Sequence, residues 1–170
     1  RIRRGECCKG IQALIKVANR SAANLSASDI GFALGPRLNA AGRLDDISIG
    51  IACLLTDDAA LADDLAQSLD EINLDRRHIE HDMQQQAEAA LAAIKRTEDL
   101  PIGMCLFNAD WHQGVVGILA SRIKEEYHRP VICFALANDD PDCDELKGSA
   151  RSISGFHIRD ALEAVATECP

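Results

Sequence analysis

Three short segments of the sequence combine small residues with side chains that bind phosphate. The first, GPRLNAAGR, places Arg37, Asn39 and Arg43 among glycine, alanine and proline. Small residues allow a ligand to approach the backbone closely, and guanidinium and amide groups donate hydrogen bonds to phosphate oxygens. If this segment is helical, Asn39 and Arg43 lie four residues apart on one face. A helix-packing turn with solvated arginines is the alternative interpretation.

The second and third segments lie in the C-terminal half of the chain. ADWHQGVVGILASR holds His112 before a helix start, where an anion is favoured, so this histidine is a candidate for phosphate contact or proton transfer. A histidine that only caps the helix is the alternative. KGSARS places Ser149 and Arg151 on one face of an extended strand, beside Gly148, and together they would bind an oxyanion. A solvated arginine on an edge strand explains the same residues.

Other patterns that could support catalysis are incomplete. His78 and His81 lie three residues apart, but no further carboxylate or thiol spacing completes a metal site. The chain has no P-loop and no GxSxG motif. Its seven cysteines are odd in number and lack CxxC spacing, so we interpret them as reduced and structural. No catalytic residue and no metal ligand is therefore assigned from the sequence.

Helices are expected throughout the first hundred residues. The apolar spacing predicts a helix over 10–18, and Ser28 followed by Asp29 is a plausible start for a second one, which Gly35-Pro36 would end. A short helix over 47–55 would follow. No glycine or proline interrupts residues 56–100, which predicts one helix of about 40 residues and roughly 60 Å.

After Pro101 the pattern alternates between strands and helices, which is typical of an α/β or α+β module. In the last predicted helix Ile158, Leu162 and Val165 are expected to face inward. The predicted elements are a strand within 102–109, a helix within 112–127, strands within 129–137 and 145–154, and a helix over 157–166.

Charge is distributed unevenly over the 170 residues, whose formal net charge is −9. Residues 1–56 carry eight Lys and Arg against four Asp and Glu, whereas residues 57–100 carry four against twelve. Binding to a polyanion is therefore expected at local patches. No apolar run reaches 18 residues, and the first residues lack the apolar stretch of a signal peptide, so we expect a cytoplasmic protein without a membrane span.

The same segments carry a resemblance to a known family. GFALGPRLNAAGRLDD, WHQGVVGILASRIKEEYHRPVICFA and LKGSARSISGFHIRDALEAV, in this order, resemble RecJ-like nucleases of the DHH phosphoesterase superfamily. The resemblance implies an α/β fold in three parts. Residues 1–56 would be the C-terminal, helical part of a DHH catalytic domain, residues 57–98 a long interdomain helix, and residues 99–170 the N-terminal part of a DHH-associated nucleic-acid-binding domain.

The resemblance also implies a function in DNA recombination and repair. Members degrade single-stranded DNA from 5′ to 3′ by hydrolysis that depends on Mn²⁺ or Mg²⁺, and single-stranded-DNA-binding protein is a candidate partner. Ser149 and Arg151 would bind a DNA phosphate, Arg37, Asn39 and Arg43 would line the opposite wall of the cleft, and His112 would face it. Ala150 stands where many members have glycine, a change that leaves Ser149 and Arg151 in place.

Departures from the family limit what this chain is expected to do. The metal ligands of the family lie in upstream aspartate-rich motifs and an Asp-His-His triplet, and a downstream Gly-Gly-His motif follows; none of these is present here. We therefore expect an internal fragment that is inactive by itself. Two alternatives stay open: a non-catalytic nucleic-acid-binding or dimerisation module, and a DHH phosphoesterase acting on short oligonucleotides. The sequence does not predict an oligomeric state.

Overall fold

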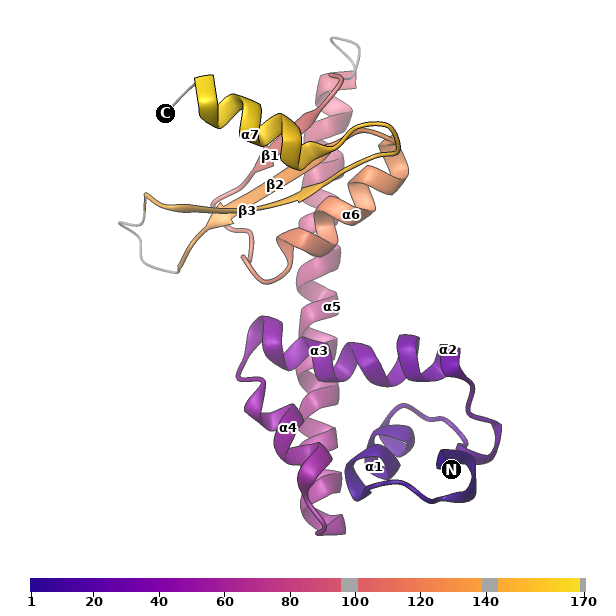
Figure 1. The fold of residues 1–170 in the computed structure, drawn as a ribbon. Coiled ribbons are helices and arrows are strands. Elements are labelled where there is room, and N and C mark those ends of the chain that lie inside the picture. Colours follow the sequence, from indigo (N-terminus) through magenta and orange to yellow (C-terminus); the bar gives the residue numbers. More distant parts are fainter. Residues whose placement is uncertain (96–100, 139–143, 169–170) are drawn as a thin grey trace. The chain divides into compact units, whose positions relative to one another are not determined.

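The computed structural model describes residues 1–95, 101–138 and 144–168. The chain divides into two units, Arg1–His78 and Ile79–Pro170, and the boundary falls inside one long helix. Helices make up the first unit, while the second also contains a three-stranded sheet (Figure 1). This is the α/β architecture with a long helix that the sequence predicts.

Four α-helices and three short helical turns precede the long helix. They are a 3-10 turn at Ile2–Arg4, α1 at Lys9–Val17, a 3-10 turn at Ala22–Asn24, α2 at Ala27–Asp29, a π-helical turn at Ile30–Leu34, α3 at Gly35–Leu44 and α4 at Ser48–Leu55. The helices expected over 10–18 and 47–55 are therefore confirmed to within a residue.

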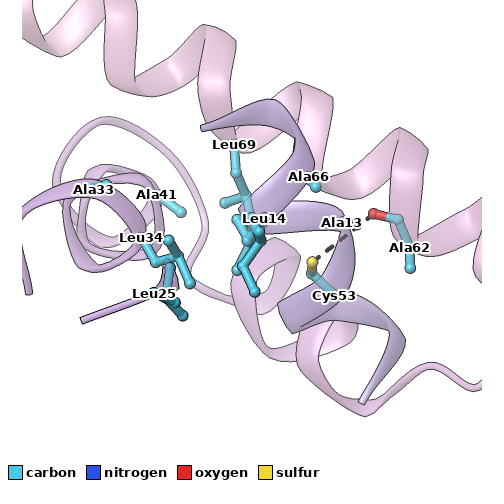
Figure 2. Close-up of a cluster of buried hydrophobic side chains, with 11 residues drawn as sticks. Ala13, Leu14, Leu25, Ala33, Leu34, Ala41, Cys53, Ala62, Ala66 and Leu69 are labelled. Carbon is cyan, nitrogen blue, oxygen red and sulfur yellow. Dashed lines mark hydrogen bonds between the residues drawn. The ribbon is translucent and has the colours of Figure 1, made fainter. Parts of the chain in front are cut away.

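Small side chains bring these helices close together in the first unit. Figure 2 shows the buried cluster, to which α1, α3, α4 and the first half of α5 (Ala59–Lys95) contribute. A side chain on Gly10 of α1 would collide with the backbone carbonyl of Cys53 in α4, so this crossing requires glycine. The cluster consists of Ala13, Leu14, Ile15, Leu25, Ala33, Leu34, Ala41, Cys53, Ala62, Ala66 and Leu69.

The segment before α3 differs from the expectation in two places. Ser26, not Ser28, caps α2, because its hydroxyl accepts a hydrogen bond from the Asp29 backbone while the Asp29 side chain accepts one from the Ser26 backbone. Gly35-Pro36 does not end the helix; the π-helical turn leads directly into α3. Glycine lacks the Cβ that clashes with a following proline, and Pro36 lies in the first turn, where its missing N–H costs little.

The long helix α5 is continuous over 37 residues. Its first turn is capped by Asp58, whose carboxylate accepts hydrogen bonds from the backbone N–H groups of Ala60 and Leu61. The expected helix is thus confirmed through Lys95, and the remainder of the predicted span, 96–100, lies outside the described residues.

The second unit is built on a sheet in the order β1–β2–β3, with bounds Met104–Phe107, Val131–Leu136 and Leu146–Arg151. β1 and β2 are parallel and are connected through α6 (Val116–Tyr127), whereas β2 and β3 are antiparallel. α6 packs against β2 and β3, and Leu119 and Ile123 of the helix and Val131 and Cys133 of β2 are all buried. All three strands and this helix match the sequence-based expectation.

The last helix, α7 (Ile158–Glu168), is formed as expected but does not pack as expected. None of its residues is buried, and Leu162 and Val165 are 45% and 57% exposed. The inward orientation predicted for Leu162 and Val165 is therefore wrong and Ile158 is half-buried, since α7 has no extensive contact with another described element. Within the described residues, no helix is both long enough and apolar enough to cross a membrane.

Candidate nucleic-acid interface

Ser149 and Arg151 lie together on the face of β3 that is turned toward α6. Ser149 pairs with Cys133 across the antiparallel ladder, and Arg151 pairs with Val131. The Nη1 atom of Arg151 donates a hydrogen bond to the hydroxyl of Ser149 over 2.9 Å. The period-two placement predicted from KGSARS is thus realised as a direct contact between the two side chains.

Neutral acceptors hold the guanidinium of Arg151. Its Nε atom donates to the Ser121 hydroxyl over 2.8 Å, and Nη1 also donates to the Ala150 carbonyl over 2.8 Å. Among the described residues, none accepts a hydrogen bond from Nη2 of Arg151, and none forms an ion pair with it. The positive charge is therefore oriented without being neutralised, which suits the binding of an anion.

Gly117 keeps the space beside these two side chains open. It lies in the first turn of α6, and a Cβ at this position would come within 3.0 Å of both Arg151 Nη2 and Ser149 Oγ. Real Cβ atoms very seldom approach polar atoms that closely, so a larger residue would displace the guanidinium. Gly148, which was expected to admit a ligand, instead lies against the Phe134 ring, because a Cβ at this position would come within 2.6 Å of that ring.

Burial keeps the floor of this site uncharged. Cys133 lies directly opposite Ser149 on β2 and is completely buried. Burial raises the pKa of the Cys133 thiol to about 12, although the positive charge of Arg151 acts in the opposite direction. At neutral pH the thiol is therefore protonated, and it neither neutralises Arg151 nor serves as a nucleophile.

His112 lies in the loop that leads into α6. Its Nδ1 atom accepts a hydrogen bond from the Gly114 backbone over 3.0 Å, which assigns the proton of the neutral ring to Nε2. Trp111 anchors the loop, because its side chain is 6% exposed and its Nε1 atom donates to Gln86 of α5 over 2.8 Å. The histidine thus stabilises its own turn, as in the alternative interpretation, and still presents one N–H donor.

Lys147 extends the same face of β3 toward the loop. Two residues before Ser149, its ammonium group donates to the side chain of Gln113 over 2.9 Å. Sequence reasoning singled out neither these two residues nor Ser121 and Gly117. The spacing contained a signal for three of them, because Lys147 continues the period of two from Ser149, and Gly117 and Ser121 are four residues apart on one helix face.

In the first unit, Arg37 is bound to a carboxylate. Its Nε atom lies 2.7 Å from the Asp70 carboxylate of α5, in a contact that is electrostatic rather than an aligned hydrogen bond. Its Nη1 atom donates to the Ala33 carbonyl over 2.6 Å. The side chains of Arg37 and Asp70 are only 15% and 19% exposed. This pair fastens α3 to α5.

The other two residues of GPRLNAAGR lie on the surface of α3. Asn39 and Arg43 are both exposed and, since the segment is helical, they lie four residues apart on one face, as predicted. The six candidate residues are thus divided: Arg37, Asn39 and Arg43 belong to the first unit, and His112, Ser149 and Arg151 to the second.

Metal-binding groups do not gather anywhere in the part of the chain that the structure describes. No group of three or more His, Cys, Asp and Glu side chains there could hold an ion. His81 of α5 instead contacts the side chain of Gln85 over 3.0 Å. The described residues therefore do not fit a divalent metal, and no step that depends on one is assigned to them.

Comparison with known proteins shows what the chain is similar to in sequence. Residues 100–170 match the family model of the DHHA1 domain. The whole chain is 57% identical to the single-stranded-DNA-specific exonuclease RecJ of Escherichia coli and covers 29% of that protein. RecJ of Bacillus subtilis is 31% identical over 90% of this chain, which covers 19% of that relative.

Solved structures show the same fold. RecJ of Thermus thermophilus in complex with Mg²⁺ superimposes with a TM-score of 0.78 and 27% identity, over 98% of this chain and 24% of that one. An exonuclease RecJ bound to manganese gives a TM-score of 0.74 and 27% identity, over 95% of this chain and 37% of that one. Residues 100–170 thus match the DHHA1 domain, and the chain resembles RecJ in sequence and fold along nearly its whole length.

Proposed function

We propose that this chain is an internal part of a RecJ-like exonuclease that degrades single-stranded DNA from 5′ to 3′ in recombination and repair. The chain spans 29% and 28% of the length of two curated relatives that are 57% identical to it, so this activity is proposed for the longer protein. The role of the chain in it is to hold the phosphate backbone of the strand.

The observation that carries this proposal is the oriented but uncompensated guanidinium of Arg151. Hydroxyl and carbonyl groups fix Nε and Nη1, and Gly117 leaves room at Nη2. Arg151 and Ser149 would donate hydrogen bonds to two oxygens of one phosphate. A single positive site of this kind suits a narrow channel for one strand, which agrees with a chain of net charge −9.

The remaining candidate residues take supporting roles in this proposal. His112 would donate from Nε2 to the backbone of the strand, and the exposed Asn39 and Arg43 would contact further phosphates from the first unit. Arg37 would act indirectly, because its ion pair with Asp70 holds the helix that carries Asn39 and Arg43.

We assign catalysis and metal binding to parts of the longer protein outside this chain. Structures of RecJ proteins contain Mg²⁺ or manganese, and we propose the same cofactors here. Because the described residues hold no metal cluster, the isolated chain is expected to cleave nothing.

The three-part division is also retained as a proposal. Residues 1–56 would complete the catalytic domain, residues 57–98 would connect it, and residues 99–170 would begin the DNA-binding domain. Single-stranded-DNA-binding protein as a partner, and a cytoplasmic location where bacterial DNA is found, belong to the same proposal.

Arg151→Ala tests the proposed function. Loss of the guanidinium should weaken binding of a 5′-phosphorylated single-stranded oligonucleotide by about tenfold, since it removes charge-assisted hydrogen bonds. It should also reduce the dependence of log K on log salt by about 0.7, which corresponds to one lost phosphate contact on a single strand. Fluorescence anisotropy over a salt titration, with the complete protein, measures both.

Arg159→Gln is the matched control, because Arg159 is an exposed arginine of the same unit whose charge is paired with Glu163 at 2.9 Å. It should leave the affinity and the salt dependence nearly unchanged. Equal affinities for Arg151→Ala and the unmodified protein at every salt concentration would remove Arg151 from the binding site.

A further inference from the structure

Ser121 links Arg151 to the backbone of α6. Its hydroxyl accepts a hydrogen bond from Nε of Arg151 over 2.8 Å and donates one to the carbonyl of Gly117 over 3.0 Å. A serine hydroxyl has one proton to donate, and its donation to Gly117 turns a lone pair toward the guanidinium. The chain of contacts Arg151–Ser121–Gly117 therefore has a defined direction.

We propose that Ser121 is a positioning residue, which sets the orientation of the Arg151 guanidinium and so determines which N–H groups face a bound phosphate. This inference rests on the proposed phosphate-binding role of Arg151. Arginine has a long side chain with many rotamers, and a planar group binds phosphate through two N–H groups only when its plane is fixed. Ser121 fixes Nε, and Ser149 fixes Nη1.

The neutral hydroxyl of Ser121 matters as much as its position beside Arg151. A carboxylate could also hold the guanidinium, as Asp70 pairs with Arg37, but it would neutralise the charge that attracts the phosphate. A hydroxyl accepts the hydrogen bond and leaves the charge in place. Orientation without neutralisation is the property that a phosphate site requires.

One turn of α6 thus supplies both conditions for binding. Gly117 and Ser121 lie four residues apart on the same helix face, the first making space at Nη2 and the second holding Nε. The phosphate of an oligonucleotide is the ligand class that fits, because the guanidinium edge and the Ser149 hydroxyl can reach two oxygens of one group.

Ser121→Ala tests this inference when it is combined with Arg151→Ala. The probe is a 5′-phosphorylated single-stranded oligonucleotide with phosphorothioate linkages, which the complete protein can bind while cleavage is suppressed. Ser121→Ala should weaken its binding by about tenfold, a typical effect of removing a hydrogen bond to a charged group. Ser121→Thr retains the hydroxyl and should restore most of the affinity.

The double variant separates positioning from an independent contact. If Ser121 acts through Arg151, then adding Ser121→Ala to Arg151→Ala should cause no further loss. Ser68→Ala is the matched control, because the Ser68 hydroxyl donates to the Asp64 carbonyl one turn back in α5, at 3.2 Å, without holding an arginine. It should leave binding unchanged.

Two results would overturn the inference, and a third would overturn its premise. Full affinity in Ser121→Ala, while Arg151→Ala binds weakly, would show that Arg151 needs no positioning by Ser121. Losses that simply add in the double variant would show that Ser121 acts independently. Full affinity in Arg151→Ala would instead refute the proposed phosphate site itself. Thermal unfolding of each variant confirms that a folded protein is compared.

Discussion

The chain contains two partly buried arginines that were expected to bind phosphate, and their surroundings differ in charge. Arg37 on α3 lies 2.7 Å from the carboxylate of Asp70. Arg151 on β3 is held by two serine hydroxyls and a backbone carbonyl. Both guanidinium groups are well oriented, but only that of Arg151 keeps an uncompensated positive charge.

This difference separates an arginine that holds helices together from one that can hold a ligand. A buried guanidinium paired with a carboxylate has its charge satisfied, and breaking the pair leaves the partner charge buried. A guanidinium oriented by neutral groups retains its attraction for an anion. The group that contacts the guanidinium, more than the arginine or its sequence motif, therefore indicates whether the arginine is structural or binds a ligand.

The largest expected effect is on stability and concerns Arg37. Arg37→Ala should lower the free energy of unfolding by about 3 kcal/mol, because the largely buried carboxylate of Asp70 would lose its positive partner. Arg151→Ala should lower it by less than about 1 kcal/mol, since the groups it leaves behind are neutral. Urea unfolding of the two variants measures the difference.

Lys16→Ala is the control for this comparison. Lys16 forms an ion pair of the same length, 2.7 Å, with Asp63, but the lysine side chain is 71% exposed. Its removal should therefore cost under about 1 kcal/mol. Equal losses of stability in Arg37→Ala and Lys16→Ala would contradict the structural role given to Arg37.

The next effect concerns the space beside Arg151. Gly117→Ala should weaken oligonucleotide binding by about tenfold, because the new methyl group displaces Nη2 of Arg151. The same change should leave unfolding unaffected or slightly raise its free energy, since alanine is the better helix former by about 1 kcal/mol. Weaker oligonucleotide binding together with an equal or higher free energy of unfolding would indicate that Gly117 serves ligand binding.

Gly31→Ala is the matched control, because no heavy atom lies within 4 Å of the position that its Cβ would take. This variant should bind normally. If Gly117→Ala also binds normally, the close approach at α6 has no part in recognition.

The smallest effect at ordinary pH comes from Cys133 beneath the same site. Its pKa is raised by burial to about 12 from an ordinary value of 9.0, so the stability that the neutral thiol contributes is complete below pH 9 and is lost as the pH rises toward 12. At pH 10 the loss should be about 1 kcal/mol. Chemical unfolding between pH 8 and pH 10 measures it.

Cys133→Ala removes this titrating group and should show a smaller decrease over the same interval, to which the remaining thiols, among them Cys53 with its pKa raised by burial, still contribute. Identical pH dependence in the two proteins would mean that the thiol beneath Arg151 is not held neutral by the fold. In that case the contrast with the Arg37–Asp70 pair would be weaker than the structure indicates.

Local sequence patterns predicted most of the elements but not their boundaries at unusual turns. Apolar patterning was sufficient for α1, α6, β1 and β2, because each of these elements buries apolar side chains. Local pattern failed at Gly35-Pro36, where the chain continues from a π-helical turn into α3 with the proline in the first turn. It also failed for the packing of α7, because an apolar face in sequence does not guarantee a partner in space.

For the site, the sequence by itself determined which residue types were available and, through the period of two along a strand, that Ser149 and Arg151 share a face. Only the tertiary structure decided how they are used. Partners from distant positions, Asp70 in an ion pair with Arg37 and Ser121 in a hydrogen bond with Arg151, set the charge of each guanidinium's surroundings. These contacts join elements separated along the chain, so no local pattern encodes them, and they are what distinguishes the two arginines.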